Sequence, residues 1–117
     1  MIGETWTLVR DGMVVGEIYV DDHEFPWYFG RFVAGEGYEE LRALFTTEAD
    51  LSERLLDAAD DGGPDDEGLN AAWEAAYARI RQLVALVHPA GHPVAEYVLH
   101  IDGDQAGFRW SDEPFAP

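Results

Sequence analysis

The sequence of 117 residues contains no cysteine and no lysine, and it has no long apolar segment. Without cysteine the chain cannot form disulfides or thiolate metal sites. No run approaches the ~18 apolar residues needed to span a bilayer. Residues 1–6 lack the basic start and the apolar run of a signal peptide. We therefore expect a cytoplasmic location and no association with a membrane.

The charge of the chain is strongly one-sided. All seven basic residues are arginine and 24 residues are acidic, so the formal net charge is −17. Such a charge opposes binding to nucleic acid or to an anionic membrane. It would favour a basic protein partner if the acids gather on one face. The alternative is an acidic bias of the whole proteome, since arginine without lysine suggests a GC-rich genome.

The residues near the C-terminus predict a hairpin, on which we expect the helices to pack. Within residues 93–110, Asp102-Gly103 is a typical tight turn. One face of the hairpin is then apolar and consists of Tyr97, Leu99, Ile101, Ala106, Phe108 and Trp110. The other face carries a polar cluster of Glu96, His100 and Arg109, with Glu96 opposite Arg109. We interpret the cluster as an exposed ion pair, because a catalytic group would need a pocket and a perturbed pKa.

Two further stretches predict strands. Residues 5–20 predict a hairpin, for which we favour a three-residue loop with a bulge at Gly12 that pairs Leu8 with Val14. Residues 27–33 predict a strand with aromatic side chains on both faces. The sequence leaves open whether this aromatic strand belongs to the core or forms a binding surface.

Helices are predicted between these strands. The first begins near Tyr38, and Thr47 is a suitable N-cap that would divide it in two. The second begins at the N-cap Asn70 and carries an apolar stripe of helical period from Trp73 to Val87. An acidic flexible loop at about residues 60–69 separates them.

The resulting order is β-β-β-α-α-β-β within a single domain, 1–117. Helices inserted in a run of strands predict an α+β fold, with an antiparallel sheet of about five strands and the helices packed on one face. Two edge strands in a small sheet permit either a monomer or a homodimer.

No pattern in the chain is typical of an enzyme. There is no nucleophile elbow and no glycine-rich loop that opens a helix. His88 and His92 have the spacing of two metal ligands on a helix, but Pro89 and Gly91 lie between them. We therefore predict a non-enzymatic protein with no metal and no cofactor.

Two binding hypotheses follow. The first is an acidic interaction protein, comparable to an immunity protein or inhibitor, that binds a basic protein partner. Its candidate contacts are the acids of the loop and one aromatic pair: Asp60, Asp61, Asp65, Asp66, Glu67, Tyr28 and Phe32. The alternative is a small-ligand binding module with its site between the sheet and the helices. Its candidate lining is aromatic: Trp27, Tyr77, Tyr97 and Phe108.

Four segments carry a resemblance to known sequences. They are FPWYFGRF (25–32), LF (44–45), WEAAYARI (73–80) and VLHIDGDQAGFRW (98–110). Together they resemble a set of short acidic, uncharacterised proteins of high-GC Gram-positive bacteria, and the resemblance extends over nearly the whole chain. It implies a bacterial, cytoplasmic protein, and it supplies neither an activity nor site residues.

Overall fold

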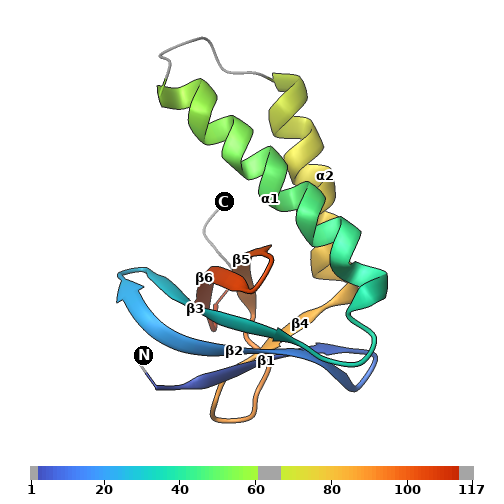
Figure 1. Cartoon of the computed structure of the whole chain (residues 1–117), viewed down its shortest axis with the longest axis vertical. Coiled ribbons are helices and arrows are strands. Elements are labelled where there is room, and N and C mark those ends of the chain that lie inside the picture. The colour runs from blue at the N-terminus through green and yellow to red at the C-terminus, as the bar shows by residue number, and fades with distance from the viewer. Residues whose placement is uncertain (1–2, 61–66, 114–117) are drawn as a thin grey trace.

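The computed structural model describes residues 3–60 and 67–113, and it has an α+β fold. Its elements are β1 (Thr5–Arg10), β2 (Met13–Glu24), β3 (Trp27–Ala34), α1 (Glu39–Asp60), α2 (Glu67–Leu83), β4 (Ala85–Val87), β5 (Glu96–Asp102) and β6 (Gln105–Ser111). The strands form one antiparallel sheet in the order β4-β1-β2-β3-β6-β5. The two helices form an antiparallel hairpin that rises from one side of this sheet (Figure 1). The predicted fold class is confirmed, and the sheet has six strands instead of about five.

The additional strand, β4, falls where the sequence predicts the end of the second helix. The helix stops at Leu83, and Leu86 then pairs with Leu8 of β1. Leu86 is completely buried. Pairing with a central strand therefore overrides the helical period of the apolar residues, as tertiary context commonly does.

The helix boundaries also differ from the prediction. Thr47 does not divide the first helix, since α1 is continuous from Glu39 to Asp60. The second helix begins at Glu67, three residues before the predicted N-cap Asn70. Both ends of the predicted loop at 60–69 are thus helical, and residues 61–66 lie outside the described part of the chain.

The first hairpin turns through two residues and not three. Asp11 and Gly12 have φ values of 52° and 81°, which a type I′ turn requires. The ladder instead shifts register immediately after Leu8. Because of this shift Leu8 pairs with Gly16 and not with Val14, and Val15 is buried while Val14 is exposed. The predicted pairing would have placed Val14 on the same face as Leu8.

The C-terminal hairpin turns at Gly103-Asp104, one residue later than predicted, and Gly103 has a positive φ of 61°. Tyr97 consequently pairs with Trp110. The register differs from the prediction by two residues, and a shift of two leaves every side chain on its predicted face. Five of the six apolar residues are buried in the core and Trp110 packs against it.

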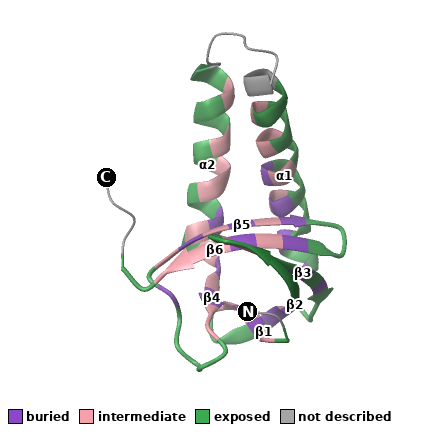
Figure 2. Ribbon diagram, turned by 90° about the vertical axis from the view of Figure 1, so that its left-hand side faces the viewer, coloured by how far each residue is buried: buried purple, intermediate pink, exposed green. Residues whose placement is uncertain are grey.

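The core occupies the inner face of the sheet and the ends of the helices nearest to it (Figure 2). Helix α1 contributes Leu41 and Phe45, and α2 contributes Ile80. Among the described helical side chains, none after Glu48 in α1 and none before Ile80 in α2 is fully buried. The distal part of the helical hairpin therefore extends beyond the core.

The two outermost strands of the sheet approach each other through the segment before β5. Val87 forms an isolated antiparallel bridge with Pro93, and the Val94 amide donates a hydrogen bond of 3.0 Å to the Leu86 carbonyl. The sheet thus curls towards a partly closed barrel.

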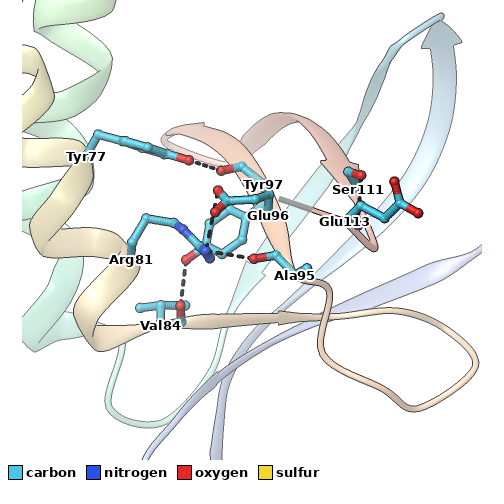
Figure 3. Close-up of polar contacts among 8 residues, drawn as sticks. All are labelled: Tyr77, Arg81, Val84, Ala95, Glu96, Tyr97, Ser111 and Glu113. Atoms are coloured by element: carbon cyan, nitrogen blue, oxygen red, sulfur yellow. Dashed lines mark hydrogen bonds and ion pairs between the residues drawn. The ribbon is translucent and has the colours of Figure 1, made fainter. Parts of the chain in front are cut away.

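Helix α2 covers the free edge of β5 with polar side chains (Figure 3). The Tyr77 hydroxyl donates a hydrogen bond to the Tyr97 carbonyl, and Arg81 donates one of 2.9 Å to the Ala95 carbonyl. In the opposite direction, the Tyr97 hydroxyl donates to the Val84 carbonyl at 2.6 Å. These bonds satisfy backbone acceptors that an uncovered edge strand would leave open to another chain.

The buried Tyr97 hydroxyl predicts a loss of stability at alkaline pH. Burial raises its pKa to about 12 from 10.0, an effect that the charge of Arg81 partly opposes. Between these two pH values the unfolded chain ionises Tyr97 while the folded chain keeps it neutral. We therefore expect its stabilising contribution to be complete below pH 10 and then to fall by about 1.4 kcal/mol per pH unit up to the folded pKa.

Urea unfolding at a series of alkaline pH values tests this expectation. Tyr97→Phe should cost about 1 kcal/mol at neutral pH, because the bond to Val84 is lost. In this variant the free energy of unfolding should also fall less steeply with pH above about pH 10. Tyr19→Phe, at an exposed position, should leave the slope unchanged, and an equal slope in all three proteins would contradict the assignment.

Candidate functional site

One carboxylate is completely buried between the two helices and the sheet. Glu48 of α1 is 0% exposed, and it is the only buried charged residue in the described part of the chain. Its Oε2 accepts a hydrogen bond of 2.7 Å from Trp73 Nε1 on α2 and one of 2.7 Å from His100 Nδ1 on β5. Glu48 therefore joins α1, α2 and β5 at one point.

The Glu48 carboxylate also determines the orientation of His100. We assign His100 Nδ1 as the donor to the Glu48 carboxylate, which leaves Nε2 for another partner. Nε2 makes no hydrogen bond to the described residues. The imidazole stacks on the indole of Trp27, with ring centroids 5.5 Å apart and planes 17° apart. Its ring plane is therefore fixed by two neighbours.

His100 lines a cleft of about 370 Å³ between the helical hairpin and the β5–β6 hairpin. The strand residues of this cleft alternate with core residues and so lie on the opposite face of β5 and β6. The lining residues are Trp27, Ser52, Leu55, Leu56, Asn70, Trp73, Val98, His100 and Arg109. Aromatic and aliphatic side chains form its walls, and an imidazole and a guanidinium are its ionisable groups.

The sheet brings Trp27 and His100 together across an intervening strand. Trp27 is on β3 and His100 on β5, and β6 lies between them. The β6 residue opposite His100 is Gly107, which has no side chain to separate the two rings. A Cβ added at Gly107 would lie 3.1 Å from the ring of Phe29, which also shows how closely this face is packed.

The helical wall is supported in the same way. Trp73 stacks on Tyr77, one turn later on α2, with centroids 5.1 Å apart and planes 4° apart. Burial raises the pKa of Tyr77, whose hydroxyl is held by the Tyr97 carbonyl. Each tryptophan of the cleft is therefore backed by a second ring that restricts its orientation.

A larger groove of about 540 Å³ lies between α1, α2 and the end of β1. Its lining includes Arg10 and Glu40, which already form an ion pair of 2.9 Å with each other. The groove has no aromatic wall and no buried ionisable group among the described residues. The smaller cleft is therefore the better candidate site.

The structure separates the predicted polar cluster. His100 and Arg109 both line the cleft, as described above. Glu96 does not: it lies opposite Ser111, and its carboxylate is 3.5 Å from Arg81. Val98 occupies the position opposite Arg109. The predicted pairing of Glu96 with Arg109 is wrong because the hairpin turns one residue later, and Glu48 is the carboxylate that contacts His100.

The predicted ligand-binding residues are divided between the two faces of the sheet. Trp27 lines the cleft, and Tyr77 backs its helical wall. Tyr97 and Phe108 are 0% exposed and belong to the core, so neither can line this site. The cleft lies between the helical hairpin and the face of β5 and β6 that is opposite to Tyr97 and Phe108.

The predicted aromatic pair for a protein partner is not an exposed patch. Phe32 is buried in the core, and the half-buried Tyr28 stacks on Phe108 at 5.6 Å. The exposed face of β3 instead carries Phe29 and Val33, each 38% exposed.

Of the acidic candidates for the same partner, two belong to the described residues and lie at the far end of the helical hairpin. Asp60 is the last residue of α1, and the exposed Glu67 is the first residue of α2. Asp61, Asp65 and Asp66 lie outside the described residues.

Sequence reasoning missed Glu48 and Trp73 as site residues. An acidic residue in a helix is usually solvent-exposed, and this is the assumption that concealed Glu48. A signal was present, however, since Glu48 follows Leu41 and Phe45 at helical spacing and so lies on the buried stripe. A carboxylate on an apolar stripe requires a partner, and that requirement points to a site.

Comparisons with known proteins give no relative for this chain. No family model, no curated protein sequence and no solved structure matches it. Within residues 3–60 and 67–113, no helix is long and apolar enough to cross a membrane. The same residues contain no group of three or more His, Asp or Glu side chains placed to hold a metal ion.

The buried carboxylate leads to a prediction for stability. Glu48→Ala removes the acceptor of two N–H groups and leaves a void, so we expect a loss of about 3 kcal/mol in the free energy of unfolding. Glu53→Ala, on the exposed side of the same helix, should change it by less than about 0.5 kcal/mol. Urea unfolding followed by tryptophan fluorescence measures both, and equal stabilities would show that Glu48 does not hold the three elements together.

Proposed function

We propose that the protein binds a small ligand in the cleft between the helical hairpin and the β5–β6 hairpin. The observation that carries this proposal is the pair of Glu48 and His100. A completely buried carboxylate holds an imidazole by Nδ1, and the imidazole forms part of the cleft wall.

A structural role alone does not account well for this pair. Burying a carboxylate is costly, and replacing a buried ion pair by apolar side chains of similar volume is often neutral or stabilising. An ionisable pair with one member at a cleft is, by contrast, a common feature of binding and catalytic sites.

The shape and the walls of the cleft support the same proposal. Its volume of about 370 Å³ lies within the range of small-molecule sites, about 300–1,000 Å³. Trp27 and Trp73 are each held by a stacked neighbour, so little side-chain freedom is lost when a ligand binds. Apolar walls with a few polar groups are the usual composition of such sites.

A thermal-shift screen of metabolites tests the proposal. A ligand present at 100 times its Kd stabilises a protein by about 2.7 kcal/mol, which corresponds to a rise in Tm on the order of 10 °C for a domain of this size. Ser52→Phe places a ring in the cleft and should abolish the shift. Thr46→Phe, at an exposed position of α1 outside the cleft, should retain it.

The result that overturns the proposal is equally specific. It would be a screen in which no compound raises Tm, or one in which Ser52→Phe and Thr46→Phe respond to each compound like the wild-type protein. In either case the cleft would not be a binding site.

A second function, binding of a basic protein partner, is favoured by the end of the β2–β3 hairpin. Phe25 is 85% exposed there, more than any other large apolar side chain described. The strand leading to it carries the exposed acids Asp21, Asp22 and Glu24. An apolar side chain surrounded by carboxylates fits a partner that has an apolar pocket with a basic rim.

This second function is tested by capture from a lysate of the source organism with elution by a salt gradient. Wild-type protein should retain a basic protein that elutes only at high salt. A hairpin variant, Phe25→Ser with Asp21→Asn and Asp22→Asn, should lose it. A control variant also has reduced negative charge, but at positions outside the hairpin: Glu39→Gln, Glu40→Gln and Glu53→Gln. If both variants retain the basic protein equally, the hairpin has no role in binding it.

A further inference from the structure

We propose that the outer face of β2 and β3 binds a second copy of this chain, so that the protein forms a two-fold symmetric dimer. In this dimer Glu17 of each copy pairs with Arg31 of the other copy. The proposal is independent of the ligand cleft. It rests on the apolar side chains that this face exposes and on two charged side chains that find no partner within the described part of the chain.

The outer face exposes apolar side chains to solvent. We define it by six residues of three neighbouring strands: Val9, Val14, Glu17, Tyr19, Arg31 and Val33. Residues that alternate with them, such as Ile18 and Phe32, belong to the core on the opposite face. Val14, Tyr19 and Val33 are 51%, 44% and 38% exposed. Apolar side chains that gather on one exposed face mark an interaction surface.

Two charged side chains lie within this surface without a partner. Glu17 is opposite Val33 and Arg31 is opposite Tyr19, so the acid and the base are diagonal neighbours on adjacent strands. Residues in such positions are about 7–8 Å apart. Neither side chain forms a hydrogen bond or an ion pair with any described residue. Four other arginines, by contrast, each pair with an acidic side chain.

A second copy is the partner that matches both charges. A two-fold axis between Glu17 and Arg31 brings the acid of each copy to the base of the other, so the same ion pair forms twice. A partner surface of a single sign would attract one of these side chains and repel the other. The outer face is therefore complementary to itself.

The charge of the whole chain restricts where two copies can meet. Each copy carries a net charge of −17, so acidic faces of two copies repel each other. On the outer face one acid and one base cancel, and the other four defining residues are uncharged. Packing of two sheets face to face is a common arrangement. Because few side chains take part, we expect a reversible dimer with a Kd in the micromolar range.

Sedimentation equilibrium of the intact protein measures the association. We expect the weight-average mass to be that of one chain at low micromolar concentration and to approach that of two chains at several hundred micromolar. A mass of one chain at every concentration would overturn the proposal.

Charge reversals locate the interface. Glu17→Arg places two bases opposite each other and Arg31→Glu places two acids opposite each other, so each variant alone should dimerise at least about tenfold more weakly. An equal mixture of the two variants should dimerise again, because every base then faces an acid. The double variant Glu17→Arg with Arg31→Glu keeps the net charge of −17 and should also dimerise.

Matched controls separate this contact from the effect of net charge. Glu53→Arg and Arg54→Glu make the same changes of charge at exposed positions of α1, and both should dimerise like the wild-type protein. Circular dichroism verifies that each variant is folded. A dimer that withstands both single reversals at the outer face, or a mixture that fails to restore it, would show that Glu17 and Arg31 do not pair between copies.

An NMR dilution series gives a readout that needs no variant. The amide signals of Glu17, Arg31 and Val33 should shift between dilute and concentrated samples, whereas those of Ser52 and Trp73 in the cleft should not. Concentration-dependent shifts confined to residues outside the outer face would place the interface elsewhere and overturn the proposal.

Discussion

The position of the helical hairpin relative to the sheet depends on the burial of a single carboxylate. Glu48 receives N–H groups from Trp73 and His100, so it links α1 to α2 and both helices to β5. Beyond this point no described side chain of α1 is fully buried, and the hairpin is held by the link and by the apolar contacts at its base. The cleft lies beside the same link, because Trp73 and His100, which bond to Glu48, also line it.

A second set of polar contacts fixes helix α2 along the edge of β5. Tyr77 donates to a backbone carbonyl of β5, and Arg81 donates to the carbonyl of Ala95 directly before the strand. Tyr97 donates in return to the carbonyl of Val84, directly after the helix. These bonds run in both directions across the interface, so a helix shifted along the strand would leave acceptors without donors. Tyr77 also stacks on Trp73, which lines the cleft. One side chain therefore contacts both the sheet edge and the wall of the cleft.

The sequence allowed prediction of the fold class and of most buried faces, because alternation along a strand depends on a period of two and not on the pairing partner. The C-terminal hairpin illustrates the limit: its register was wrong by two residues while its core face was right, and Glu96 was therefore assigned to the wrong neighbour. Strand β4 could not be predicted from local sequence, because its partner β1 is distant from it in the chain. Of the site, His100, Arg109 and Trp27 were recognisable as candidates, whereas Glu48 became one only when its burial was known.

The position of β1 in the sheet also bears on the order of assembly. β1 pairs on one side with β2, which follows it directly, and on the other with β4, which the chain reaches only after both helices. The entropy of closing so long a loop opposes the second pairing until other contacts compensate for it. The β1–β2–β3 meander and the helical hairpin are local in sequence and can form early. We therefore expect the docking of β4 on β1 to come late, as should the equally non-local pairing of β6 with β3.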